Sequence, residues 1–307
     1  MTHEEISFIP HTPSVLKQIF IRRGITPNKR FGQNFLTDQN AMLCIPDIAD
    51  LTEDDIVLEI GTGTGGLTRL LAARSRQVFT IEVDRKLFEL SSDILRLYNN
   101  TIPLNADILK TKHALNPYIT SLIYNWLREH GHAAIKVVSN LPYNISTPVV
   151  INLLENDLPI SEMVLMLQQE ITERMTALPG TREYGMLSVI IRLFSEVEVV
   201  KSLPPEVFWP KPSVHSAIVK VRVQKEKYAG RITDYPFFRQ IINAIFTSRR
   251  KTLINSLERL NIPGISREHL KQILKDMQLD ERIRGETLDV DQLIHLAEAI
   301  GKRKPFG

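Results

Sequence analysis

The sequence is poor in cysteine and has no long apolar run. Its single cysteine, Cys44, excludes an internal disulfide bond and a metal cluster held by thiolates. No stretch reaches the length of a membrane-spanning helix, so we expect no membrane association. The first residues include Glu4 and Glu5 and lack an apolar core, unlike a secretory signal or a transit peptide. These absences predict a cytoplasmic protein, and no metal site is expected.

The net charge is small but unevenly distributed. The formal charge of the 307 residues is +3, of which residues 1–30 carry +3, residues 226–307 carry +4 and the segment between them carries −4. A mildly acidic central segment between basic ends suggests that the ends bind a polyanionic partner. Ordinary solvated lysine and arginine side chains remain a serious alternative at this modest imbalance.

The most informative stretch of the sequence runs from residue 55 to residue 67. Its short apolar run Ile56 to Leu58, with Glu59 directly after it, predicts a buried parallel strand. Three glycines follow at alternate positions: Gly61, Gly63 and Gly65. A helical pattern begins at Leu67. A strand, a glycine turn and a helix form the first crossover of a doubly wound α/β domain, where glycine lets a ligand approach the backbone.

Acidic residues lie at the ends of the next two expected strands. Glu82 lies in a strand expected at Phe79 to Val83, and Asp107 follows a strand expected at Ile102 to Asn105. A carboxylate after the second strand can accept hydrogen bonds from both hydroxyls of a ribose. That ribose could belong to NAD, because the glycines also fit the dinucleotide fingerprint, or to S-adenosylmethionine. With Glu59 just before the glycines, the E-x-G-x-G-x-G form resembles the first motif of methyltransferases, and Asp107 is in a position to take an adenine amine. Both features favour S-adenosylmethionine.

The alternation of strands and helices continues to a fourth strand, expected at Ala134 to Val138. This spacing predicts a doubly wound, mostly parallel sheet that helices cover on both faces, which is a Rossmann-like α/β fold. Ligands of such sheets bind beyond the carboxyl ends of the strands. The stretch Ser139 to Pro148 occupies that position after the fourth strand.

Side chains in this stretch suit a planar ring that bears an exocyclic amine. Asn140 offers a carbonyl acceptor and an amide donor. Pro142 stiffens the turn and leaves the carbonyl of Leu141 free to accept a hydrogen bond. Tyr143 provides a flat face on which a base can stack. We therefore predict a binding site for an amino-substituted ring, with an asparagine-capped turn and a packed tyrosine as the simpler alternative.

The regions that flank the alternating segment have a different pattern. A short helix is expected at Val15 to Arg23, with Ser14 as its N-cap and a basic loop after it. Past Pro204 one strand is expected at Ser216 to Val223. The pattern then becomes helical, at Phe237 to Phe246, Thr252 to Leu260, Arg267 to Met277 and Val290 to Ile300. We predict an N-terminal segment (1–30), the α/β domain (31–225) and a small all-helical C-terminal domain (226–307).

Two further stretches allow two interpretations on spacing alone. The loop Phe31 to Leu36 precedes a helix capped by Thr37 or Asp38, and it either packs or closes over a ligand on the glycine turn. Packing is the favoured interpretation. The basic run Arg249 to Lys251 is expected at the beginning of a helix. Its side chains are either simply solvated, which is the interpretation that spacing favours, or they contact phosphates.

Several long motifs occur one after another along the chain. They are Phe31–Leu36 (FGQNFL), Glu59–Gly65 (EIGTGTG), Asp107, Asn140–Ser146 (NLPYNIS), Pro204–Ala217 (PPEVFWPKPSVHSA) and Phe246–Leu253 (FTSRRKTL). In this order they resemble the ribosomal RNA adenine N6-dimethyltransferase family, and most closely its bacterial branch that acts on the small subunit. The resemblance covers nearly the whole chain, from about Leu16 to Leu296, and is far more specific than one glycine loop.

The resemblance implies roles for individual residues. The residues that would contact S-adenosylmethionine are Asn34, Leu36, Gly61, Gly63, Glu82, Asp107 and Asn140. The catalytic stretch would be Asn140-Leu141-Pro142-Tyr143, with the target adenine stacked between Tyr143 and Phe208. The basic run Arg249, Arg250 and Lys251 would contact RNA phosphates. His215 stands where the family usually has aspartate, and we interpret it as a structural variant of its loop.

The implied function is the dimethylation of two adjacent adenines in the 3′-terminal hairpin of small-subunit (16S) rRNA. The partner would be an assembling 30S particle, and the enzyme would be a monomer. One alternative in the same fold is an erythromycin-resistance enzyme that modifies 23S rRNA. A non-catalytic RNA-binding assembly factor is a second, which intact Glu59 and Asp107 argue against. A NAD-dependent oxidoreductase is a third, and it leaves the stretch Asn140 to Tyr143 without a role.

Overall fold

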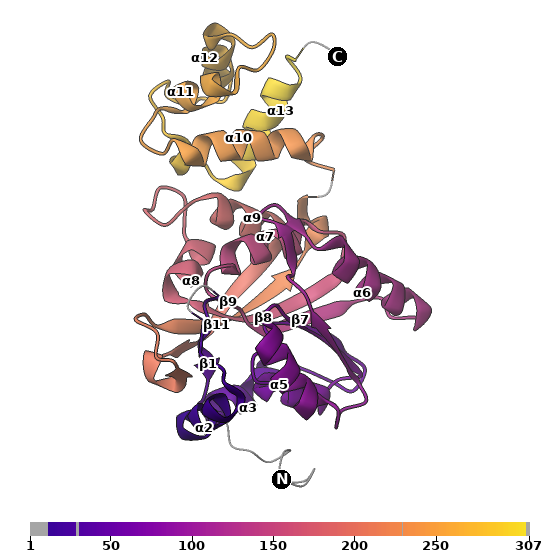
Figure 1. Ribbon diagram of the computed structural model, residues 1–307. Helices are drawn as coiled ribbons and strands as arrows, with labels where there is room; N and C mark the ends of the chain where they lie inside the picture. The colour runs from indigo at the N-terminus through magenta and orange to yellow at the C-terminus, as the bar shows by residue number, and fades with distance from the viewer. Residues whose placement is uncertain (1–11, 29–30, 229, 305–307) are drawn as a thin grey trace. The chain divides into compact units, whose positions relative to one another are not determined.

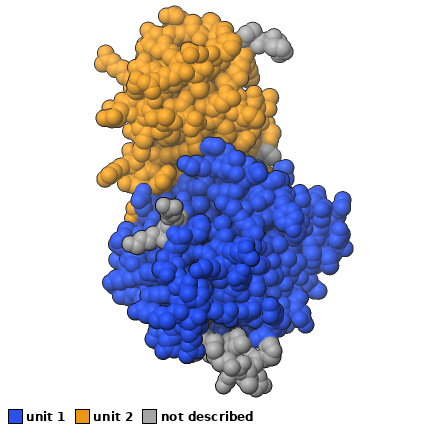
Figure 2. Space-filling model, viewed as in Figure 1, with its two compact units in different colours: residues 1–172, 196–223 blue, residues 173–195, 224–307 orange. Residues whose placement is uncertain are grey.

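The computed structural model describes residues 12–28, 31–228 and 230–304. Glu4 and Glu5, and Lys29 and Arg30 of the expected basic loop, lie outside these described residues. The chain divides into two compact units, drawn in different colours in Figure 2. The first consists of the described parts of residues 1–172 and 196–223, and the second consists of residues 173–195 and the described parts of 224–307.

The first unit is built on one large sheet (Figure 1). Its seven strands lie in the order β4-β3-β2-β7-β8-β11-β9. Their bounds are β2 Ile56–Ile60, β3 Gln77–Glu82, β4 Thr101–Asn105, β7 Ile135–Asn140, β8 Ile160–Gln168, β9 Ser195–Leu203 and β11 Ser216–Val223. The strands from β4 to β8 pair in parallel, and β11 pairs antiparallel with β8. The predicted Rossmann-like, mostly parallel sheet is confirmed.

Five of the seven strands coincide with the predicted ones, and β8 and β9 were not predicted. The centre of β8, Met163 to Leu167, is a continuous apolar run, which periodicity alone does not distinguish from a buried helix segment. The β9 sequence is mostly exposed and carries charged residues, so it lacks the apolar signal of a buried strand. Two shorter pairs complete the unit: β1 Phe35–Leu36 with β10 Phe208–Trp209, and β5 Leu109–Thr111 with β6 Ala114–Leu115.

Helices cover both faces of the sheet. The helices of this unit are α2 Pro13–Arg23, which packs against α5 and the β1–β10 pair, and α3 Gln39–Ile48, α4 Gly66–Ala72, α5 Arg85–Leu95, α6 Pro117–Glu129, α7 Ser146–Glu155 and α8 Gln169–Thr176, the last of which continues into the second unit. On β3, Val78 belongs to the buried cluster formed with α3 and α4. Its neighbour Phe79 contacts Trp126 of α6 edge-on, with ring centroids 5.6 Å apart. Because successive strand residues point to opposite faces, α4 and α6 lie on opposite sides of the sheet.

The helix starts near the N-terminus differ in part from the predicted ones. Of the two predicted candidates, Thr37 and Asp38, the N-cap of α3 is Asp38. Its side chain accepts a 2.7 Å hydrogen bond from the Ala41 amide. The prediction of Ser14 as the cap of α2 is wrong. Thr12 is the cap, and Pro13 takes the first helical position, where its missing amide hydrogen costs nothing.

The second unit is helical, apart from loops. Its helices are α9 Met186–Phe194, η3 Lys225–Tyr228, α10 Tyr235–Thr247, α11 Leu253–Leu257, η4 Glu258–Leu260, α12 Arg267–Asp276, η5 Gly285–Thr287 and α13 Val290–Gly301. The fully buried Tyr184 ties the loop before α9 to this unit, because its hydroxyl donates to the Leu288 carbonyl over 3.0 Å. The prediction that the basic run Arg249 to Lys251 begins a helix is wrong. The run lies in the turn between α10 and α11, and Thr252 caps α11.

Within the part of the chain that the structure describes, the helices are all too short or too polar to cross a lipid bilayer.

Candidate active site

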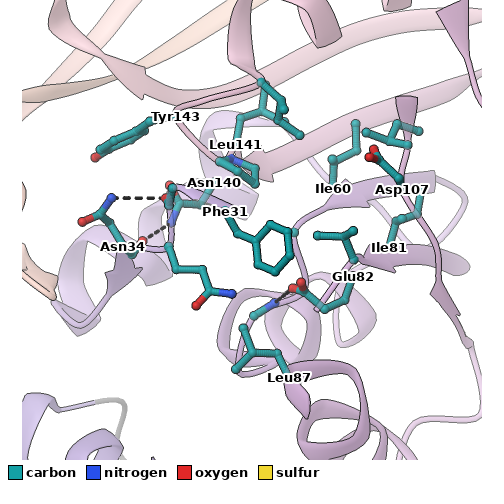
Figure 3. A pocket seen from close by; sticks show the side chains of 18 of the residues that line it. Phe31, Asn34, Ile60, Ile81, Glu82, Leu87, Asp107, Asn140, Leu141 and Tyr143 are labelled. Atoms are coloured by element: carbon teal, nitrogen blue, oxygen red, sulfur yellow. Dashed lines mark hydrogen bonds between the residues drawn. The ribbon is translucent and has the colours of Figure 1, made fainter. Parts of the chain in front are cut away.

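A pocket opens at the carboxyl ends of β2, β3, β4 and β7 (Figure 3). It has a volume of about 630 Å³, including the solvent space at its mouth. Nine residues predicted to form the site line it: Asn34, Gly61, Gly63, Glu82, Asp107, Asn140, Leu141, Pro142 and Tyr143. Residues far apart in the sequence thus meet where an α/β sheet binds its ligands.

The glycine turn lets other loops pack closely against it. Gly61 has a φ of +90°, and a Cβ atom there would lie 3.3 Å from the ring of Pro142. Gly63 has a φ of +56°, and its Cβ would lie 3.2 Å from the ring of Phe35. Both positions need glycine because of the backbone angle and because of the tight contact. The turn therefore supports the loop that begins at Asn140.

Glu82 is buried at the end of β3, and two backbone amides hold its carboxylate. Gly63 donates to Oε2 over 2.8 Å, and Asp84 donates to Oε1 over 2.9 Å. Burial raises the pKa of Glu82, while the two amide donors act in the opposite direction. The carboxylate oxygens keep lone pairs that can accept from two hydroxyl groups of a ligand.

Glu59 is the most deeply buried acid near the pocket, with 1% of its surface exposed. Thr68 and Thr80 each donate a hydroxyl hydrogen to its Oε2 over 2.6 Å. Thr62 joins the group through a 2.6 Å hydrogen bond with Thr80. Burial raises the pKa of Glu59 to about 8, although the threonine hydrogen bonds lower it. Glu59 therefore joins β2, the glycine turn, α4 and β3 in one polar network.

The N-terminal loop fixes the side chain of Asn140. The Asn140 amide donates a 3.0 Å hydrogen bond to the Asn34 carbonyl. Gly32, with a φ of +61°, lies against the same strand-end loop: a Cβ atom there would be 3.0 Å from the Tyr143 amide nitrogen. Gln33 anchors the N-terminal loop from the other side, because its side chain donates to Asp84 over 3.0 Å. Residues 31–35 thus form one wall of the pocket.

Tyr143 is held at its hydroxyl as well as through its backbone. Its hydroxyl lies 2.6 Å from the hydroxyl of Ser216, the first residue of β11. Burial raises the pKa of Tyr143, so the phenol stays protonated at neutral pH. Figure 3 shows Tyr143 beside Asn140, and its ring contributes to the wall of the pocket.

Two predicted site residues lie elsewhere. Leu36 pairs with Phe208 in the small β1–β10 sheet and lines a second hollow of about 370 Å³, which shares Gly61, Gly63 and Asn140 with the main pocket. Phe208 is only 3% exposed, inside the cluster that includes Leu36. Its ring therefore has no free face for a base, and the second stacking surface predicted at Phe208 is not present in this structure.

The remaining predicted residues differ in their surroundings. Asp107 is exposed at the pocket edge, and its Oδ1 accepts from the Leu109 amide over 2.9 Å. In the second unit, Arg249 is paired with Glu286 over 2.9 Å, whereas Arg250 and Lys251 are exposed. The side chain of His215 is exposed. Among the described residues, no three His, Cys, Asp or Glu side chains are grouped so as to hold a metal ion.

Sequence reasoning missed three contributors to the site. Gln33 lies within a quoted motif, but no local pattern reveals its contact with Asp84 in another loop. Ser216 is 73 positions from Tyr143, so only the folded sheet brings them together. Phe31 lines the pocket, where Figure 3 shows its ring between the two sets of strand-end residues.

Comparison with known proteins identifies a family for the chain. The family model described as "Ribosomal RNA adenine dimethylase" matches residues 24–296. The protein named "Ribosomal RNA small subunit methyltransferase A" in Halothermothrix orenii is 37% identical over 291 residues, which cover 94% of this chain and 93% of that one. The protein of the same name in Bacillus cereus is 38% identical and covers 94% of this chain and 96% of that one.

Solved structures share the fold and much of the length. A dimethyladenosine transferase from Plasmodium falciparum has a TM-score of 0.70 at 26% identity, covering 88% of this chain and 98% of that one. The 23S rRNA methyltransferase ErmE has a TM-score of 0.58 at 25% identity, covering 87% of this chain and 99% of that one. Since the family model spans most of the sequence and the named relatives match almost end to end, the chain belongs to the ribosomal RNA adenine dimethylase family.

Proposed function

We propose that this protein dimethylates N6 of two adjacent adenines in the 3′-terminal hairpin of small-subunit (16S) rRNA. The substrate would be the RNA within an assembling 30S particle, and the enzyme would act as a cytoplasmic monomer. The observation that carries the proposal is the Asn140–Tyr143 loop, which is held beside a glycine-lined pocket by the N-terminal loop. The names of relatives at 37–38% identity support the choice of the small subunit.

The residues of the pocket fit S-adenosylmethionine. Glu82 at the end of β3 would accept from the ribose hydroxyls, and Asp107 after β4 would accept from the adenine amine. The second hollow, between Leu36 and the glycine turn, would hold the amino-acid end. When bound, the cofactor supplies a methyl group already activated by its sulfonium.

The task left to the protein is to place the adenine. The lone pair of N6 is delocalised into the ring, so the amine is a poor nucleophile. Asn140 donates its amide to Asn34, which leaves Oδ1 available to accept one N6–H, and the Leu141 carbonyl would accept the other. These two hydrogen bonds would turn the lone pair out of the ring plane, towards the cofactor site. Solvent can take the proton that the amine loses, so no side-chain base is required.

RNA binding would use both the base and the backbone. A paired adenine must first leave its stack, which costs a few kcal/mol. Stacking on Tyr143 would offset roughly 1–3 kcal/mol of that cost. Arg250 and Lys251, exposed in the α10–α11 turn, would contact phosphates and make binding sensitive to salt. We assign catalysis to residues 31–225 and RNA binding chiefly to residues 226–307.

The nearest alternative is modification of 23S rRNA, since the structure of ErmE has the same fold. Methyl transfer from labelled S-adenosylmethionine to undermethylated small subunits, with 23S rRNA in parallel, tests the two functions against each other. We expect dimethyladenosine only in the small-subunit hairpin, and none with the Asn140→Ala variant. Asn125→Ala, on the exposed surface of α6, is the matched control and should keep full activity.

Other outcomes would lead to different conclusions. Label in 23S rRNA would assign the protein to the resistance type. Cofactor binding without methyl transfer to either RNA would favour a non-catalytic assembly factor. Full activity of Asn140→Ala would show that the catalytic site lies elsewhere.

A further inference from the structure

The hydrogen bond between Tyr143 and Ser216 joins the strand-end loop to a rigid part of the sheet. The two hydroxyls are 2.6 Å apart, and Ser216 is completely buried. The backbone of Ser216 is paired with Gln168 of β8 in an antiparallel ladder. Directly beside it, the Gln169 amide donates to the His215 carbonyl over 2.9 Å. Ser216 is therefore a fixed point that cannot follow a movement of Tyr143.

The backbone of Tyr143 is fixed independently of this hydrogen bond. The Ser146 hydroxyl and the Ile145 amide both donate to the Pro142 carbonyl, over 3.0 and 3.2 Å. Gly32 packs against the Tyr143 amide from the other side. These interactions set where the ring begins, but they leave the ring free to rotate about its side-chain bonds. The hydrogen bond to Ser216 removes that remaining freedom, because it holds the far end of the ring.

We propose that Ser216 is a positioning residue for methyl transfer, since its hydroxyl holds the Tyr143 ring at the angle at which the target adenine stacks. The inference rests on the proposed function, in which Tyr143 is the stacking surface. Phe208 has no free face in this structure, so Tyr143 would hold the base alone. An error in the angle of its ring would then move N6 directly, and small misplacements of reacting atoms cost large factors in rate.

The test compares Ser216→Ala, Tyr143→Phe and the double variant in steady-state methyl transfer to undermethylated small subunits. Each single change removes one partner of the hydrogen bond and keeps the aromatic ring. We expect each variant to lower kcat by roughly 3- to 10-fold, because this is the effect of losing the free energy of one hydrogen bond. The KM for the particle should change by less than about twofold. The double variant should be no slower than the slower single variant, because both changes break the same hydrogen bond.

A second readout follows the base itself. With 2-aminopurine at the target position of the hairpin, stacking on Tyr143 quenches the fluorescence of the extruded base. We expect weaker quenching in Ser216→Ala and Tyr143→Phe, which a purely structural role of Ser216 would not produce. Ser91→Ala is the control: this serine is also fully buried, but its hydroxyl donates to the Phe88 carbonyl of its own helix, so kcat should not change.

Three outcomes would overturn the inference. The first is wild-type kcat and quenching in Ser216→Ala while the wild-type protein is active. The second is losses that multiply in the double variant, since they would show that the two hydroxyls act separately. The third is a wild-type protein that transfers no methyl group, which would remove the proposed function as well. If Ser216→Ala does not fold, Tyr143→Phe tests the same hydrogen bond without altering the buried strand.

Discussion

The side-chain amide of Asn140 donates a hydrogen bond to the backbone carbonyl of Asn34, although 106 positions separate the two residues. This hydrogen bond fixes which end of the carboxamide faces the pocket. An amide donor directed at a carbonyl leaves its oxygen turned the other way. The N-terminal loop therefore determines the chemical character that the strand-end loop presents to a substrate.

The variant Asn140→Asp tests this orientation with almost no change in shape. An aspartate has no hydrogen to donate, so its oxygen would face the Asn34 carbonyl and be repelled. We expect kcat for methyl transfer to fall by roughly 100-fold, because a displaced side chain misplaces the amine. Asn125→Asp, on the exposed face of α6, should have no effect. Retained activity in Asn140→Asp would show that the hydrogen bond to Asn34 is dispensable.

Gly32→Ala tests the close packing of the N-terminal loop, and Gly24→Ala is its matched control. Both glycines have a φ near +60°, so alanine costs each roughly 1–2 kcal/mol of backbone strain. A Cβ at Gly32 would in addition lie 3.0 Å from the Tyr143 amide nitrogen, whereas at Gly24 nothing lies within 4 Å. We expect backbone strain to lower the thermal stability of both variants, the added contact to lower that of Gly32→Ala further, and methyl transfer to be lost only in Gly32→Ala. Equal activities of the two variants would contradict this prediction.

The buried Glu59 should make stability depend on pH. Its pKa is raised from 4.5 in the unfolded chain to about 8 in the folded protein. Between these values the folded protein holds a proton that the unfolded chain has released, so the free energy of unfolding falls as pH rises, by up to roughly 1.4 kcal/mol per pH unit. Denaturant titrations from pH 5 to pH 9 measure this slope.

The variant Glu59→Gln identifies the source of that pH dependence. Glutamine has a similar shape and does not titrate, so its stability should fall less between pH 5 and pH 8. A smaller slope of the same sign should remain, because burial also raises the pKa of Glu82. The exposed Glu53→Gln is the control and should keep the wild-type slope. An unchanged slope in Glu59→Gln would assign the effect to other groups.

The three basic residues predicted to bind RNA should divide into two kinds. Arg249 is ion-paired with Glu286 and donates to the Thr181 carbonyl over 3.3 Å, so it holds loops of the second unit together. We expect Arg249→Ala to lower the free energy of unfolding by roughly 1 kcal/mol. The exposed Arg250 and Lys251 should have no such effect when replaced by alanine.

RNA binding separates the two kinds again. Replacing Arg250 or Lys251 should weaken binding to small-subunit RNA and reduce the slope of log K against log salt by roughly 1 for each phosphate that the variant no longer binds. Filter binding at several salt concentrations measures that slope. Unfolding by denaturant, measured on the same samples, is the control for stability. A salt slope that stays constant in both variants would place the RNA-binding surface elsewhere.

The sequence predicted the parts of this molecule that depend on neighbours in the chain. Buried strands such as Ile56–Ile60 and the cap Asp38 follow from local patterns of apolar and capping residues. The pocket residues Gly61, Glu82, Asp107 and Asn140 were predictable because the carboxyl ends of parallel strands share one edge of the sheet.

What the sequence could not predict depends on interactions between distant segments. The burial of Phe208 follows from its pairing with Leu36 across the β1–β10 sheet, and two-residue strands leave no periodic signal. The partners of Arg249 and Tyr143 are likewise set by tertiary structure. In each case the residue type indicated the chemistry of the side chain, but its exposure and its partners could not be predicted from the sequence.

The small β1–β10 sheet has a consequence for the synthesis of the protein. Leu36 is translated early, but its partner Phe208 and the nearby Ser216 are translated 172 and 180 residues later, as the numbering shows. A nascent chain that already contains Gly61, Glu82 and Asn140 therefore still lacks Phe208, which pairs with Leu36, and Ser216, which holds the Tyr143 hydroxyl. The active site of this protein can therefore form only after most of the chain has been synthesised. The ribosome that makes the protein must complete most of its work before the protein can act, as we propose, on unfinished ribosomal subunits.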